Sequence, residues 1–146
     1  MHRGELLAKN PLFRDLTKEE IAAIDAISEP HEVVGGDTLF HAGAKADMLY
    51  VVLLGTLEMK APGHEHRLAR FGTGQIVGVG AFVEGGEYPS NVTAVEVTRL
   101  LRIPCAALRK LFAAEPAIEL KFYRNAARDF AHHVKQMAVE LDRPYF

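Results

Sequence analysis

The chain has 146 residues, of which 49% are hydrophobic and 25% charged, and its formal net charge at pH 7 is −2. These values are typical of one soluble globular domain, and they give no electrostatic footprint for nucleic acid or for an anionic membrane. A single cysteine excludes a disulfide framework, no apolar run approaches the ~20 residues of a membrane span, and no signal sequence follows Met1. We therefore expect a soluble cytoplasmic protein.

The first thirty residues carry helical patterns. Apolar residues in the range 6–13 have helical spacing, which Pro11 interrupts. Thr17 and Glu20 then form a capping box, which predicts the start of an amphipathic helix. Pro30 is expected to end that helix.

Between residues 31 and 104 the pattern changes to short β-branched or aromatic runs separated by Gly and Pro turns. Seven or eight short strands at near-regular spacing indicate an antiparallel sandwich or barrel rather than βαβ units. The runs are Val33–Val34, Thr38–Phe40, Met48–Leu54, Leu57–Met59, Leu68–Phe71, Val92–Val97 and Leu100–Ile103.

Helical periodicity returns after Pro104, first in a short segment that ends near Ala113 and then in a long run over 118–142 without Gly or Pro. The long run has a heptad pattern of apolar residues. Its members are Leu120, Tyr123, Ala127, Phe130, Val134, Met137 and Leu141. Because this stripe is too apolar to leave in water, we expect a homodimer whose contact runs from Ala127 onward.

The most informative motif is Gly78-Val79-Gly80-Ala81-Phe82, which Pro89-Ser90-Asn91-Val92-Thr93-Ala94 follows. With the preceding turn glycines, it resembles the β-roll and phosphate-binding cassette of the cyclic nucleotide-binding domain family. This module is the sensor of catabolite-activator-type regulators and of kinase regulatory subunits. The resemblance spans nearly the whole chain and implies a mainly β fold: an antiparallel, double-stranded, jelly-roll-like β-roll with flanking helices.

In this interpretation residues 1–146 form a single domain. N-terminal helices occupy residues 1–30, the β-roll occupies 31–104 with its cassette at 78–94, and C-terminal helices, the last of them long, occupy 105–142.

Two residues depart from the family pattern. The family places a Glu at the position of Val79, to bind a ribose hydroxyl, and an Arg at the position of Ser90, to pair with the cyclic phosphate. A charge-assisted hydrogen bond contributes about 1.5–3 kcal/mol, so losing both contacts lowers affinity by roughly a hundredfold or more. Three alternatives follow: an altered small phosphate-bearing ligand, an ordinary cyclic nucleotide, or no ligand.

The candidate ligand-binding residues come from the cassette and from the long helix, which the resemblance implies closes over the base of the ligand. They are Gly78, Val79, Gly80, Ala81, Phe82, Pro89, Ser90, Asn91 and His133. One hypothesis is a stand-alone sensor that binds a small anionic ligand and signals through its C-terminal helix. The other is a dimerisation or scaffold module, in which Gly78 and Gly80 form only a barrel corner and Phe82 and Tyr88 fill the pocket.

The remaining motifs do not indicate a catalytic or metal-binding site. His64-Glu65-His66 lacks the further ligand that a metal site needs and is interpreted as a solvated hairpin tip. Cys105 has no recognisable catalytic partner, and no nucleophile elbow or P-loop occurs, so we expect neither an enzyme nor a metal site. No helix-turn-helix follows the long helix, so direct DNA binding is not expected.

Overall fold

Two four-stranded sheets form the middle of the chain in the computed structural model, which describes residues 3–63 and 67–143. Their strand orders are β1-β8-β3-β6 and β2-β7-β4-β5, and all the strand pairs are antiparallel. The strands are β1 (Glu29–Val33), β2 (Thr38–Phe40), β3 (Met48–Leu54), β4 (Leu57–Lys60), β5 (Arg67–Phe71), β6 (Ile76–Val77), β7 (Asn91–Ala94) and β8 (Thr98–Pro104). The predicted antiparallel β-roll is confirmed.

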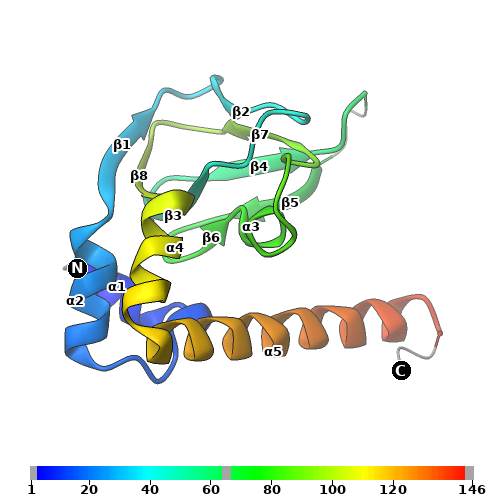
Figure 1. The fold of residues 1–146 in the computed structure, drawn as a ribbon. Helices are drawn as coiled ribbons and strands as arrows, with labels where there is room; N and C mark the ends of the chain where they lie inside the picture. Colours follow the sequence, from blue (N-terminus) through cyan, green and yellow to red (C-terminus); the bar gives the residue numbers. More distant parts are fainter. Residues whose placement is uncertain (1–2, 64–66, 144–146) are drawn as a thin grey trace.

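Helices flank this roll before and after it in the chain. They are α1 (Arg3–Lys9), the 3-10 helix η1 (Pro11–Phe13), α2 (Lys18–Ala26), α3 (Val79–Glu84), α4 (Cys105–Ala114) and α5 (Pro116–Glu140). Figure 1 shows α1, α2, α4 and the first turns of α5 gathered together, while the later turns of α5 extend past them beneath the roll.

The boundary between α2 and β1 differs from the expectation. The capping box is present, because Thr17 Oγ1 accepts from the Glu20 N–H at 3.1 Å and Glu20 Oε1 accepts from the Thr17 N–H at 2.8 Å. The helix ends at Ala26, however, and Pro30 lies within β1, opposite Leu101. An edge strand tolerates proline because one row of its N–H groups needs no partner.

Two further strand predictions were wrong in detail. Strand β6 has only two residues and was missed because so short a run carries no period. The expected strand over 92–97 stops at Ala94, and a turn precedes β8. The cause is tertiary: Gly55, at φ +107°, brings the β3–β4 turn so close to this segment that a Cβ on it would lie 2.7 Å from Thr98 Cα.

The face of α5 that packs on the body is not the one that the heptad pattern indicated. Its first half buries Ile118, Phe122, Asn125 and Ala126, whereas Leu120 is 63% exposed. The helix therefore docks through a stripe rotated from the heptad positions. Of the other heptad residues, Tyr123 packs partly buried against the helical core, and Ala127, Phe130, Val134, Met137 and Leu141 are exposed.

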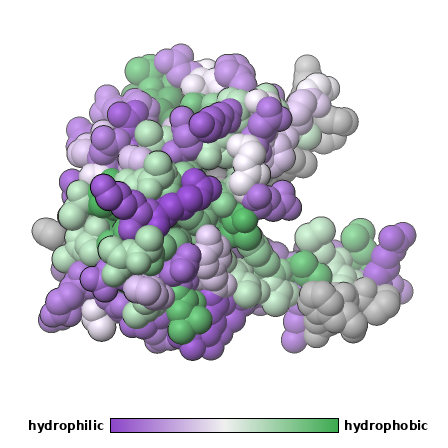
Figure 2. All heavy atoms as spheres, in the orientation of Figure 1, coloured by the Kyte–Doolittle hydropathy of each residue, from purple (hydrophilic) through white to green (hydrophobic). Residues whose placement is uncertain are grey.

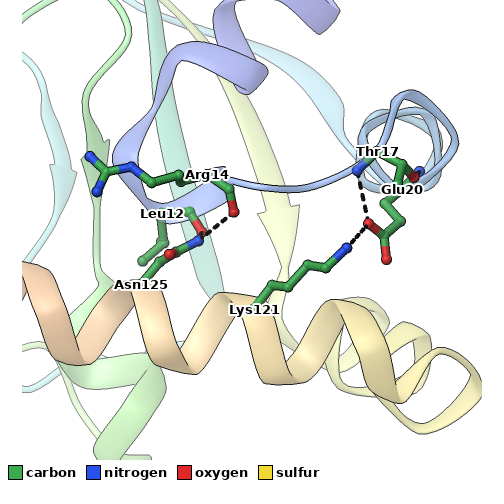
Figure 3. A network of polar contacts seen from close by, with 6 residues as sticks. All are labelled: Leu12, Arg14, Thr17, Glu20, Lys121 and Asn125. Carbon is green, nitrogen blue, oxygen red and sulfur yellow. Dashed lines mark hydrogen bonds and ion pairs between the residues drawn. The ribbon is translucent and has the colours of Figure 1, made fainter.

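Polar contacts anchor the same half of α5 to the N-terminal segment (Figure 3). Asn125 Nδ2 donates to the carbonyl oxygens of Leu12 at 3.0 Å and Arg14 at 2.8 Å. Lys121 Nζ lies 2.6 Å from Glu20 Oε1, and this hydrogen bond lowers the pKa of the Glu20 carboxyl below its usual value. Both anchors precede residue 127, so the second half of α5 is held less firmly.

Candidate functional site

Helix α3 begins at a glycine that no other residue could replace without strain. Gly78 is its N-cap and has a φ of +100°. A Cβ at this position would lie 3.3 Å from Met48 O and 3.4 Å from Leu49 Cδ2. The first N–H group of α3 that is bonded within the helix is that of Phe82, which donates to Gly78 O at 3.0 Å. The N–H groups that precede it in the first turn have no partner inside the helix and are free to bind a ligand.

We expect Gly78→Ala to lower the free energy of unfolding by about 1–3 kcal/mol, because alanine is strained at positive φ and its Cβ crowds β3. Gly80→Ala is the matched control, since a Cβ at Gly80 meets nothing within 4 Å. Urea denaturation of both variants measures the difference. An equal loss of unfolding free energy in the two variants would contradict the prediction that Gly78 is specifically required by its positive φ.

Two hollows meet at this turn. The inner one, about 150 Å³, lies in the mouth of the roll between Phe40, Tyr88 and Ser90. The outer groove, about 340 Å³, lies between the cassette and α5. Both are lined by Met59, Gly78 and Gly80, so they adjoin at the start of α3. Figure 2 shows the surface hollowed where the end of α5 extends from the body.

Most of the predicted ligand residues lie on these two hollows. Gly78, Gly80, Ala81, Pro89 and Ser90 line the inner one. The outer groove is lined by Gly78, Val79, Gly80 and His133.

Ser90 is the most informative of these residues. It is only 6% exposed, and its hydroxyl has no hydrogen-bond partner within the described part of the chain. No buried side-chain oxygen or nitrogen lacks a partner among the described residues, so the Ser90 oxygen is still reached from the hollow and is available to a bound polar group. On the groove side, the partly buried Val79 packs against the helical core, and the imidazole of His133 lies 3.7 Å from the Asp129 carboxylate.

Two predicted residues point elsewhere. The Phe82 side chain turns away from both hollows into the helical core, where its ring contacts Phe112 and Phe122. It lines neither hollow. Asn91 lines neither hollow, and its Oδ1 accepts from the Ala42 N–H at 2.8 Å, so it holds the loop after β2.

Tyr88 closes the back of the inner hollow. Its ring stacks on Phe40 with centroids 3.7 Å apart, and its hydroxyl donates to Met48 O at 2.6 Å and accepts from the Met48 N–H at 3.2 Å. Burial raises the pKa of Tyr88 above its usual value, so the phenol stays neutral. The scaffold hypothesis anticipated this residue. Phe40 and Met59 were missed because apolar strand residues look like core in a sequence, and Phe130 was predicted only as a dimer residue.

The hollows have little charge. Among the described residues, no Lys or Arg lines either of them; their ionisable side chains are Asp129 and His133 at the groove and the neutral phenol of Tyr88 at the inner hollow. An anionic ligand would therefore rely on neutral donors: the N–H groups at the start of α3 and the Ser90 hydroxyl.

The profile of the cyclic nucleotide-binding domain matches residues 30–115, more than half of the chain. The chain belongs to the cyclic nucleotide-binding domain family. A solved structure of the same fold, the N-terminal domain of a transcriptional regulator from Streptomyces coelicolor, is 30% identical and superposes with a TM-score of 0.79 over 88% of this chain and 94% of that one.

Longer proteins also contain a similar region. A protein assigned as a potassium channel in Rhodopseudomonas palustris is 35% identical over 117 residues, which are 80% of this chain and 28% of the channel. A CRP-like cAMP-activated global transcriptional regulator of Mycobacterium tuberculosis is 28% identical over 127 residues, which are 85% of this chain and 57% of the regulator. The chain thus spans only part of these relatives, and the cyclic nucleotide-binding domain is what they share with it.

The sequence also predicted that the chain has no membrane span, no metal site and no catalytic activity. In residues 3–63 and 67–143, no helix is long and apolar enough to cross a bilayer, and no three ligating side chains gather as a metal site would require. His64-Glu65-His66 lies outside the described residues. A matching region also occurs in a lysophospholipase of Neosartorya fischeri, as 8% of its length, so the absence of catalysis stays a prediction for this chain.

Proposed function

We propose that this chain is a regulatory sensor domain that binds a small phosphate-bearing ligand, a cyclic nucleotide or an analogue, and signals through α5. The observation that carries the proposal is the Ser90 hydroxyl, which has no partner within the described residues and lines the same inner hollow as the glycine turn of α3. Membership of the cyclic nucleotide-binding domain family supports the ligand class.

The outer groove supports the link to α5. It is lined by Gly78 and Val79 of the cassette and by Phe130 and His133 of α5. Those two α5 residues lie beyond the anchoring contacts of Lys121 and Asn125. A ligand in the groove would touch both the cassette and the less firmly held part of α5. If the second half of α5 can adopt two positions relative to the roll, a ligand that contacts one of them better would shift the equilibrium toward that position.

Isothermal titration against cyclic AMP, cyclic GMP and cyclic dinucleotides tests the proposal. We expect binding of at least one member of the panel, and weak or no binding of ordinary cyclic AMP, because no Lys or Arg among the described residues lines the hollows. A panel without any measurable heat, repeated with a thermal-shift readout, would overturn the sensor proposal.

The second candidate function is a ligand-free dimerisation module, and the exposed stripe on α5 favours it. Phe130, Val134, Met137 and Leu141 are between 37% and 61% exposed on a helix that extends from the body. Such an apolar stripe is suited to a second copy of the same helix. The two functions are compatible, since a sensor can also be a dimer.

We expect Phe130→Glu combined with Val134→Glu to convert a homodimer to a monomer, because it places like charges on both sides of the contact. Gln136→Glu with Val139→Glu is the matched control, since it adds the same charge to exposed residues on the side of the helix opposite the stripe and should leave the dimer intact. Sedimentation velocity measures both. A wild type that is already monomeric at tens of micromolar would contradict the dimer.

A further inference from the structure

A row of basic side chains follows another face of α5. Arg124, Arg128, His132 and Lys135 are spaced by four, four and three residues, so they lie on one side of the helix. All four are exposed, and none of them forms an ion pair within the described residues. In a chain with a net charge of −2, this is a local concentration of positive charge.

The row runs into a cleft of about 320 Å³ between η1 and α5. Arg14 lines one side of the cleft, Arg128 and His132 line the other, and Asn125 contributes from α5. The carbonyl oxygen of Arg14 is fixed by Asn125, and Figure 3 shows the Arg14 side chain extending away from Lys121. We call this site, defined by Arg14, Asn125, Arg128, Asp129 and His132, the arginine cleft.

The arginine cleft also contains hydrogen-bond acceptors. Asn125 is 3% exposed; its Nδ2 donates to two carbonyl oxygens, while its Oδ1 has no partner within the described part of the chain. The Asp129 carboxylate also lines the cleft, and the imidazole of His133 lies 3.7 Å from it. A ligand that satisfies the cleft must bring carboxylates or similar anions for the arginines and N–H donors for the two acceptors.

We propose that the arginine cleft binds an acidic peptide segment of a partner protein. An acidic peptide supplies carboxylates from its side chains and N–H donors from its backbone. A phosphate chain, a nucleic-acid backbone or the phosphates of a lipid surface offer anionic oxygens without N–H donors, so the Asp129 carboxylate and Asn125 Oδ1 would gain no donor from them. The mixture of cations and acceptors thus favours a peptide over a polyphosphate, a nucleic acid or a membrane.

The peptide site and the apolar stripe can be occupied together. Arg128 and Phe130 are two residues apart and therefore point roughly 160° apart around the helix. A homodimer through Phe130 and Val134 would leave Arg128 outside the contact. The inference does not rest on the proposed ligand site, and either can fail alone.

Fluorescence anisotropy with a labelled decaglutamate peptide at low ionic strength tests the proposal. We expect saturable binding that weakens with added salt, and a loss of at least about tenfold in Arg14→Gln/Arg128→Gln. The matched control is Lys45→Gln/Lys110→Gln, which removes the same charge from exposed residues that do not line the cleft and should change affinity less than twofold. Arg14→Lys/Arg128→Lys should fall between, because lysine keeps the charge without the bidentate geometry.

Competition identifies the class of partner. Unlabelled decaglutamate should displace the label, and decaglutamine should not. The peptide assignment would be overturned if polyphosphate, single-stranded DNA or phosphatidylserine vesicles displaced the label at a lower concentration of negative charges than unlabelled decaglutamate does. Equal losses in the cleft variant and the lysine control, or no binding at low salt, would overturn the site itself. Thermal melts of all three variants confirm folding, since every substituted side chain is exposed.

Discussion

Val79→Glu combined with Ser90→Arg should bind cyclic AMP roughly a hundredfold more tightly than the wild type. The two positions lie on opposite sides of the glycine turn, Val79 on the outer groove and Ser90 on the inner hollow. The glutamate would accept from a ribose hydroxyl and the arginine would pair with the phosphate, at about 1.5–3 kcal/mol for each contact. Replacing Ser90 breaks no hydrogen bond, because its hydroxyl has no partner within the described part of the chain.

The double variant should also exceed the sum of the single ones. Either substitution alone buries an unpaired charge, whereas together the two charges partly compensate each other. Calorimetry of the wild type, both singles, the double and an uncharged Val79→Gln/Ser90→Gln control measures this. Tight binding by the wild type would show that the neutral donors suffice. No gain in the double would indicate that Tyr88 and Phe40 keep the inner hollow closed, and would favour the scaffold function.

Phe122→Ala should be among the most destabilising single changes, with a loss of about 3–5 kcal/mol in the free energy of unfolding. The ring is fully buried and contacts four other aromatic rings, at centroid distances of 5.1–6.4 Å: Phe13, Phe82, Phe112 and Tyr123. Removing it leaves a cavity where α5 docks. Leu120→Ala, on the exposed face of the same helix, should cost less than about 0.5 kcal/mol.

Chemical denaturation of the two variants under the same conditions measures the difference. Similar losses in both would mean that the heptad positions, rather than the stripe through Phe122, hold the helix. The contact of Phe122 with Phe82 also gives the variant a second expected effect. Because Phe82 belongs to α3, loosening this contact should disturb the cassette as well as α5.

The sequence alone determined the features that depend on neighbouring residues. The Thr17–Glu20 capping box, the glycine turn before α3 and the long helix without Gly or Pro were all predicted, because each signal lies within a few residues of its effect. The spacing of the short strands indicated an antiparallel sandwich or barrel, and the resemblance to the cyclic nucleotide-binding domain family implied the β-roll. The two departures at Val79 and Ser90 were also visible, and they define the central question about the ligand.

Only the tertiary structure decided which faces are used. The periodicity of α5 shows that the helix has apolar residues on more than one face, but not which face packs on the body. That choice depends on how Phe122 packs among aromatic rings from η1, α3 and α4. The same packing turns Phe82 away from both hollows and leaves Ala81 lining the inner one. The arginine cleft likewise needs Arg14 and Arg128, more than a hundred residues apart in the chain, to line one cleft, and no local pattern in the sequence encodes that arrangement.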